Sequence, residues 1–229
     1  MKDKGYFTFL RKQLSQFEIV FLVSGNHEPY GSSWDVVKSK LIKFEEEIRT
    51  RKETGAGKVG KFILLDQTRY DLSLSMTILG CKLFSNVAPD QAQDVSFGLN
   101  DFFQIDEWTV EQHTSSHLSD LAWLNSQVSS ISKSDPDRKI IILSHYSPTT
   151  DERSVDPKHV GSKISPGFMT DLGGEECWKS KSVIYWGFGH THNNCDLVDG
   201  DTGKRVVTNQ RGYYFAQSVG FEHDKCVEV

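Results

Sequence analysis

Three short runs of large apolar residues constrain the fold of this chain more than any other feature. They cover residues 18–23, 139–143 and 182–187, and each is rich in β-branched or aromatic side chains. Runs of this length and composition are typical of strands that are buried on both faces. Each run leads into a turn that carries histidine, and the three turns are Gly25-Asn26-His27-Glu28, Ser144-His145 and Gly189-His190-Thr191-His192.

Apolar residues spaced three and four apart predict helices between these strands. One helix covers 34–48 behind a cap at Ser32 or Ser33. A second carries Leu118 to Ile131, with Ser115 or Ser116 as its cap, and a third covers about 6–13. Strands that alternate with helices imply a layered α/β domain.

Two further regions, 64–84 and 195–215, have the pattern of antiparallel strands, the second with turns at Gly200 and Gly203. We therefore expect a mixed sheet or a sandwich of two sheets. A chain of 229 residues, 37% of them hydrophobic, is long enough to bury one substantial core. The expected organisation is a single domain over 1–229.

Charge and cysteine usage narrow the class of protein. The chain has 26 basic and 31 acidic residues, so no basic surface indicates a nucleic-acid partner. The longest apolar runs are too short to span a bilayer, which predicts no membrane partner. The four cysteines form no Cys-x-x-Cys pair, so we expect free thiols, no zinc knuckle and a cytoplasmic location.

The histidine turns predict a metal site. Ligands of open α/β sheets bind beyond the carboxyl ends of the strands, so the three turns would deliver Asn26, His27, His145, His190 and His192 to one crevice. Neutral imidazole is the commonest ligand of zinc, iron and manganese, and the asparagine carbonyl adds a harder donor. Glycine beside the histidines makes positive φ available, so that the chain can turn sharply at Gly25 and Gly189.

Taken singly, these histidines are weak signals. A lone Ser-His after a strand is usually a hydrogen-bonded core or surface residue, and a lone His-x-His is only moderately suggestive. We expect His113 and His117, on or beside the second helix, to have hydrogen-bonded structural roles. His159 lies in the long stretch 147–179, where the expectation is a solvated loop that can overhang the crevice.

Gly-Asn-His-Glu, Ser-His and Gly-His-Thr-His, in this order, resemble the motifs of the calcineurin-like metallophosphoesterase superfamily over about residues 17–213. The resemblance implies a layered α/β/β/α sandwich with mixed sheets that hydrolyses phosphate esters through two divalent ions of the Mn, Fe or Zn type. It implies that Asn26, His145 and His190 ligate one metal and that His192 ligates the other. His27 would stabilise the transition state or protonate the leaving group.

Two other motifs of that superfamily, Asp-x-His and Gly-Asp-x-x-Asp, do not occur in this sequence. We therefore expect an N-terminally incomplete domain that lacks its first strand or strands and holds one metal ion or none. The competing hypothesis is a non-catalytic fragment or pseudoenzyme that retains the fold and partial metal or phosphate binding. A structural zinc or nucleic-acid module would need clustered cysteines or a basic face, and a serine hydrolase would need a Gly-x-Ser-x-Gly turn.

Overall fold

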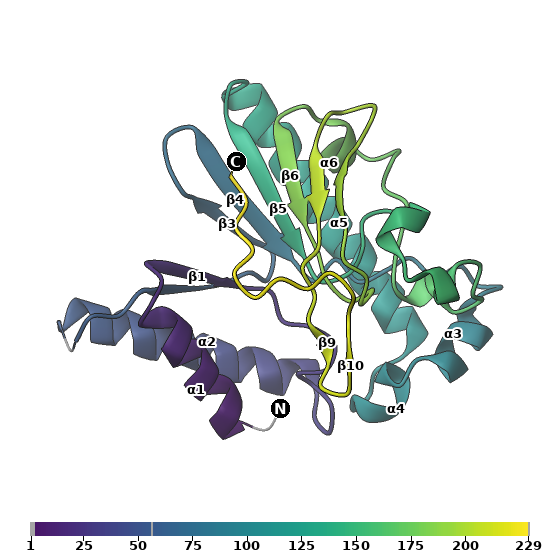
Figure 1. Cartoon of the computed structure of the whole chain (residues 1–229), viewed down its shortest axis with the longest axis horizontal. Helices are drawn as coiled ribbons and strands as arrows, with labels where there is room; N and C mark the ends of the chain where they lie inside the picture. Colours follow the sequence, from purple (N-terminus) through teal and green to yellow (C-terminus); the bar gives the residue numbers. More distant parts are fainter. Residues whose placement is uncertain (1–2, 56, 229) are drawn as a thin grey trace.

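The computed structural model describes residues 3–55 and 57–228, which form a mixed α/β fold (Figure 1). The helices are α1 (Asp3–Leu14), α2 (Trp34–Glu53), α3 (Ala92–Gly98), α4 (Asp101–Gln104), α5 (Val110–Ser134) and α6 (Glu176–Lys179). The strands are β1 (Ile19–Leu22), β2 (Lys61–Leu64), β3 (Thr68–Asp71), β4 (Met76–Cys81), β5 (Lys139–Ser144), β6 (Val183–Gly187), β7 (Asp196–Val198), β8 (Arg205–Val207), β9 (Gly212–Tyr213) and β10 (Ala216–Gln217).

A six-stranded mixed sheet forms the largest layer, in the order β3-β4-β5-β6-β8-β7. The four inner strands are parallel, whereas β3 and β7 run antiparallel to their neighbours at the two edges. The expectation of a mixed sheet is therefore confirmed. Because β5 and β6 are adjacent and parallel, the turns that follow them leave the sheet at the same edge.

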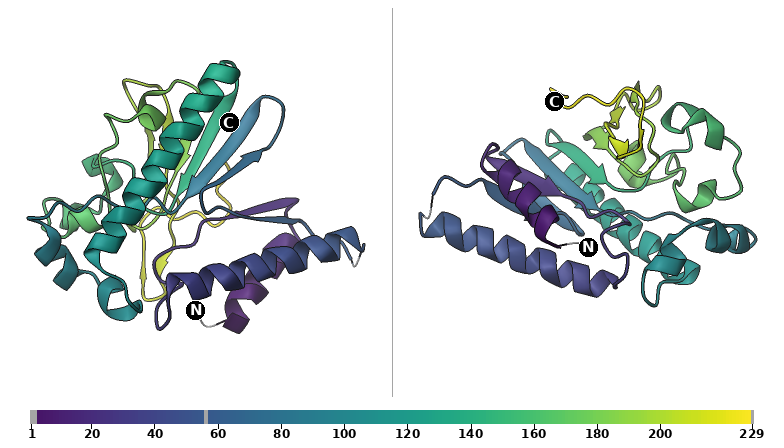
Figure 2. Two further views of the ribbon diagram at one scale, coloured as in Figure 1. Left: turned by 180° about the vertical axis from the view of Figure 1, so that it is seen from behind. Right: turned by 60° about the horizontal axis from the view of Figure 1, so that its bottom comes forward.

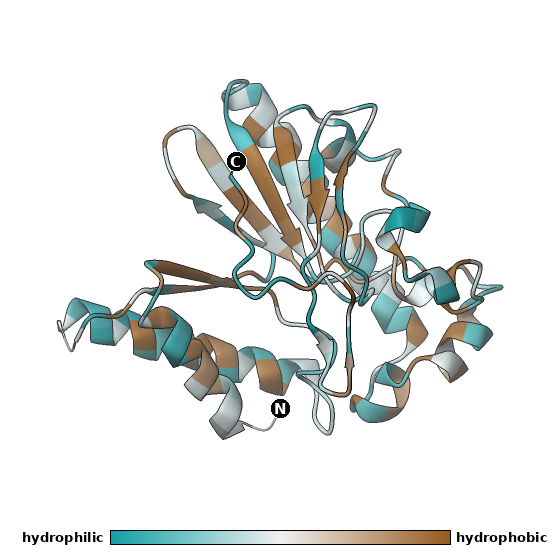
Figure 3. Ribbon diagram, viewed as in Figure 1, coloured by the Kyte–Doolittle hydropathy of each residue, from teal (hydrophilic) through white to brown (hydrophobic). Residues whose placement is uncertain are grey.

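A separate parallel pair, β1 with β2, packs between the six-stranded sheet and the helices α1 and α2 (Figure 2). Side chains such as Phe21 face the cluster shared with the large sheet, and side chains such as Val20 face the cluster shared with the two helices. Both strands are strongly apolar (Figure 3). The expectation that this strand is buried on both faces is confirmed in part, because both faces pack against apolar clusters but all four residues remain partly exposed. In the described ranges β1 has one strand neighbour, which leaves its other edge unpaired.

The long helix α5 covers the other face of the six-stranded sheet (Figure 2). It begins earlier than the sequence predicts, because Thr109 caps it and forms a capping box with Gln112. The predicted core position Leu118 is 56% exposed. The buried face carries polar residues in this part of the helix, namely His113, His117 and Asp120.

The remaining predictions are confirmed in part. The side chain of Ser33 caps α2 as expected. Strands β3 and β4 form the expected antiparallel pair, but β2 pairs in parallel with β1. The 195–215 region forms the antiparallel pair β7–β8 and the start of the hairpin β9–β10. All four cysteines are free thiols, as predicted. No helix in the described ranges is both long and apolar enough to cross a membrane.

Candidate metal centre

The turns after β1 and β5 bring Asn26 and His145 into contact. The His145 Nε2 atom lies 3.0 Å from Asn26 Oδ1 and 3.3 Å from the backbone nitrogen of Asn26. The two residues are 119 positions apart in sequence and come from different layers of the fold. The expectation that these two turns converge is therefore confirmed for this pair.

His190, in the turn after β6, joins the same group. Its ring centroid lies 4.9 Å from that of His145, and the ring packs between Tyr146 at 4.3 Å and Phe168 at 4.7 Å. The Nε2 atom of His190 is buried and has no hydrogen-bond partner within residues 3–55 and 57–228. A buried polar atom without a partner is destabilising in a protein interior, and a bound metal ion is one way to satisfy it.

Asp101 is a part of the site that no sequence pattern indicated. It is 2% exposed, and its Oδ1 accepts hydrogen bonds from Asn26 Nδ2 at 2.7 Å and from the Tyr30 hydroxyl at 2.5 Å. The Tyr146 hydroxyl donates to its other oxygen at 3.3 Å. Because Asp101 holds the amide nitrogen of Asn26, the amide oxygen is left facing His145. Supporting hydrogen bonds of this kind orient the ligands of metal sites.

His27 and His192 lie beside a further residue that the sequence did not indicate, Tyr213. The His27 ring lies 4.6 Å from the Tyr30 ring in a tilted arrangement and stacks on the Tyr213 ring at 5.8 Å. His192 contacts the same Tyr213 ring edge-on at 4.5 Å. Among the ring contacts in the described part of the chain, His192 meets neither His145 nor His190. The structure therefore brings Asn26, His145 and His190 together and places His192 with Tyr213 and His27.

The expected positive φ angles do not occur at the glycines of the histidine turns. The positive φ angles belong to His190 (68°) and His192 (51°), not to Gly25 or Gly189. A side chain at position 25 would collide with the imidazole of His145, because a Cβ there would lie 2.8 Å from its Cε1 atom. Glycine at this position therefore allows the turn to approach the candidate centre closely. Left-handed backbone at non-glycine residues is strained, and such strain concentrates at functional sites.

Burial keeps the imidazoles of the centre neutral. It lowers the pKa of His145 to about 3 and the pKa of His190 well below its ordinary value, with smaller effects from the neighbouring histidines. The pKa of His192 is lowered too, first by burial and then by His27. A neutral imidazole has a free lone pair at neutral pH, which is the form that binds metal ions.

Two other buried histidines have structural roles, as predicted. His113 Nε2 accepts a hydrogen bond from the backbone nitrogen of Ser85 at 3.0 Å, and His117 Nδ1 lies 2.8 Å from the carbonyl oxygen of Leu83. These bonds hold the segment after β4, where Leu83 and Phe84 both have positive φ. That segment packs against the centre, since the rings of Phe84 and Tyr146 lie 5.5 Å apart.

The donor set fits a partial site for one divalent ion. Across 3–55 and 57–228, no three His, Cys, Asp or Glu side chains form a group that could hold a metal. What remains is a set of two imidazoles and one amide oxygen, from His145, His190 and Asn26. Nitrogen and oxygen donors of this kind suit zinc, iron or manganese, with water able to complete the shell.

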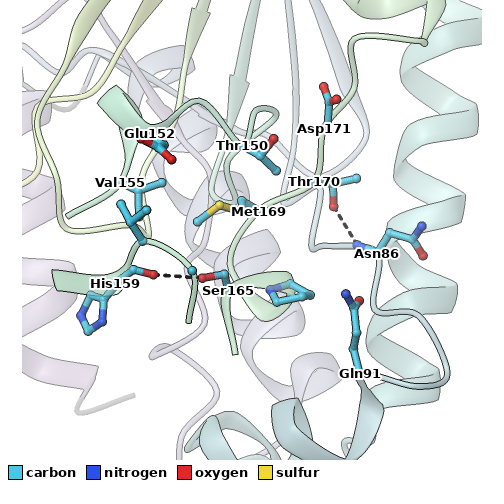
Figure 4. Close-up of a pocket in the computed structure, with 13 residues that line it drawn as sticks. Asn86, Gln91, Thr150, Glu152, Val155, His159, Ser165, Met169, Thr170 and Asp171 are labelled. Carbon is cyan, nitrogen blue, oxygen red and sulfur yellow. Dashed lines mark hydrogen bonds between the residues drawn. The ribbon is translucent and has the colours of Figure 1, made fainter. Parts of the chain in front are cut away.

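A pocket of about 360 Å³ lies in the loop region after β5 (Figure 4). Its lining includes Glu152, His159 and Met169, together with Asn86 and Gln91 from the segment before α3. A hydrogen bond from Asn86 N to Thr170 Oγ1, at 2.8 Å, closes one side (Figure 4). None of the five predicted site residues lines this pocket.

Comparison with known proteins gives one weak similarity. The chain is 23% identical to an uncharacterized protein of Acanthamoeba polyphaga mimivirus over 219 residues, which cover 92% of this chain and 74% of that protein. A comparison with the sequence models of protein families gives no match. Since the viral protein is itself uncharacterized, the similarity assigns no function.

Proposed function

We propose that this chain is a metal-dependent hydrolase of phosphate esters from the calcineurin-like metallophosphoesterase superfamily, with the α/β/β/α sandwich of that superfamily. The observation that carries the proposal is the contact between Asn26 and His145 beside His190, whose buried Nε2 atom is unsatisfied. These residues come from three separate turns with the motif order of that superfamily. The packing of β1–β2 between α1, α2 and the large sheet supports the proposed layering.

Each residue then has a role that follows from its contacts. Asn26, His145 and His190 would hold a divalent ion, which supplies a Lewis acid and lowers the pKa of bound water towards neutrality. Asp101 keeps the Asn26 amide oriented through its 2.7 Å hydrogen bond. His27, an exposed residue in contact with the rings of Tyr30 and Tyr213, would donate a proton to the ester oxygen that gains charge as the leaving group departs.

A second candidate is a non-catalytic protein that binds a metal ion or phosphate without turnover. It is favoured by the lack of a group of three His, Cys, Asp or Glu ligands in the described ranges. In this candidate Asn26, His145 and His190 keep a partial site, and His192 has no second ion to ligate.

Hydrolysis of 4-nitrophenyl phosphate with added Mn²⁺ separates the two candidates. We expect manganese-stimulated hydrolysis that a chelator removes and that His27→Ala abolishes, whereas His223→Ala, a change at an exposed histidine, leaves it intact. No hydrolysis by the wild-type chain favours the non-catalytic protein, and full activity of His27→Ala contradicts the role of His27. Metal analysis should find one tightly held ion or none, so two stoichiometric ions would contradict a partial centre.

A further inference from the structure

The hairpin β9–β10 places Tyr213 beside His27 and His192. Its strands pair with each other and lie outside the six-stranded sheet (Figure 1). Gly212, with φ of 74°, allows the hairpin to close, because a Cβ there would lie 2.8 Å from the carbonyl oxygen of Ala216 and from the nitrogen of Ser218. Glycine at position 212 therefore allows the backbone conformation that positions Tyr213.

Both ends of the hairpin are tied to the loop that carries His192. The side chain of Gln210 accepts a hydrogen bond from His192 N at 2.8 Å. Asn194 Nδ2 donates to the carbonyl oxygen of Gln210 at 2.9 Å and to that of Val219 at 3.0 Å. The hairpin and the histidine turn therefore form one connected unit, so that residues of the hairpin keep a fixed relation to the centre.

The Tyr213 ring lies between two histidines of the site. It stacks on His27 with an interplanar angle of 21° and meets His192 at 83°. The residue is 52% exposed, and its hydroxyl has no hydrogen-bond partner in the described ranges.

The tip of the hairpin presents two aromatic side chains to solvent directly beside Tyr213. Tyr214 is 78% exposed and Phe215 is 96% exposed. Their rings contact each other edge-on at 4.8 Å and contact no other ring in the part of the chain that the structure describes. Exposed aromatic faces of this kind bind flat apolar groups, because stacking removes apolar surface from water on both partners.

We propose that the aromatic segment Tyr213–Phe215 binds the alcohol portion of the substrate and selects phosphate esters of planar aromatic alcohols. The inference rests on the proposed function, because it places the phosphoryl group at Asn26, His145 and His190. The leaving group then extends past His27 towards the hairpin, which is continuous with the centre through the Tyr213 ring. An ester of glycerol or of another small aliphatic alcohol has no flat apolar face and gains little from this segment.

Binding of two phosphonates that cannot be hydrolysed tests the inference separately from turnover. We would titrate the Mn²⁺-supplemented chain with 1-naphthylmethylphosphonate and with methylphosphonate by calorimetry. The wild-type chain should bind the naphthyl compound at least about tenfold more tightly, a difference of about 1.4 kcal/mol. In the double variant Tyr214→Ser/Phe215→Ser this preference should fall below about threefold. Because both side chains are exposed, the variant should fold, which its thermal unfolding curve will check.

Leu74→Ser is the matched control, because Leu74 is 92% exposed but lies in the β3–β4 turn, at the end of the sheet away from the centre. Its preference for the naphthyl compound should equal that of the wild type. Equal affinity of the wild type for both compounds, or a preference that survives in the double variant, overturns the role of the hairpin and leaves the proposed function standing. Failure to bind either compound, together with no hydrolysis, overturns both.

Discussion

Replacing Gly25 with alanine tests whether the close approach of this glycine to His145 positions the metal centre. The added Cβ would lie 2.8 Å from Cε1 and 3.2 Å from Nδ1 of the His145 ring. The ring is partly buried and packs against Tyr146 and His190, and Asn26, the residue after Gly25, lies with its Oδ1 atom 3.0 Å from the Nε2 atom of the ring. The substitution therefore acts on the geometry of a candidate ligand without removing any ligand.

The size of the effect follows from these distances. Carbon atoms in van der Waals contact lie about 3.5 Å apart, so the ring or the turn must move by roughly 0.7 Å. Overpacking a well-packed interior in this way lowers the free energy of unfolding by about 1–3 kcal/mol. A binding site tolerates displacement of its ligands by only about 0.5 Å, so the affinity for a divalent ion should also fall.

Urea unfolding in a chelating buffer measures the stability effect, and calorimetric titration with Zn²⁺ or Mn²⁺ measures the effect on metal binding. The control is Gly189→Ala, because a Cβ at Gly189 meets the same ring at an ordinary 3.5 Å. We expect Gly25→Ala to lose stability and metal affinity while Gly189→Ala keeps both. Equal behaviour of the two variants would refute the reasoning.

Three further predictions follow from buried groups. Asp101→Asn should lower the free energy of unfolding by about 2 kcal/mol in urea and weaken metal binding, because it removes a charged acceptor of three hydrogen bonds; an unchanged unfolding midpoint would contradict this role. His113 and His145 have a pKa of about 3 in the fold. Histidine in an unfolded chain has a pKa of about 6.5, so above that pH neither histidine lowers the free energy of unfolding. Between that pH and pH 3 the unfolded chain binds more protons than the fold, and the free energy of unfolding falls on acidification by up to about 1.4 kcal/mol per pH unit for each histidine. Urea midpoints of the metal-free chain that do not change between pH 7 and pH 5 would exclude this dependence. In helix α5, Leu124→Ala should lower the free energy of unfolding by about 2–5 kcal/mol, whereas Leu118→Ala should lower it by less than about 0.5 kcal/mol. Similar unfolding curves for the two variants would show that Leu124 does not lie on the buried face of the helix.

The elements that the sequence predicts best are those with a strong local pattern. The three apolar runs become β1, β5 and β6, and helix α2 begins after the predicted cap at Ser33. Convergence of His145 with His190 was also predictable, because β5 and β6 are adjacent and parallel and the turns after them leave the sheet at the same end, whereas Asn26 reaches His145 from the separate β1–β2 pair. These features depend on residues near each other in sequence, or on one general rule of topology.

The parts that the sequence did not predict depend on contacts between distant segments. The start of α5 was misplaced because His113, His117 and Asp120 interrupt the apolar stripe, yet these side chains are buried because they form hydrogen bonds with the backbone of Leu83 and Ser85. Asp101 has no local signal, since only the fold brings it to Asn26 across 75 residues. Tyr213 likewise becomes part of the site through the hairpin, which no hydrophobic period reveals.

The left-handed backbone of His192 has a consequence for anyone who engineers this protein. Its φ of 51° lies in a region that glycine adopts without strain. Other residues in this region have a conformational strain of about 1–3 kcal/mol. A library screened only for heat resistance should therefore enrich His192→Gly, because the exchange relaxes the turn. The heat-resistant variants from such a screen would lack the imidazole beside Tyr213, so selection for heat resistance alone would remove a residue of the candidate site.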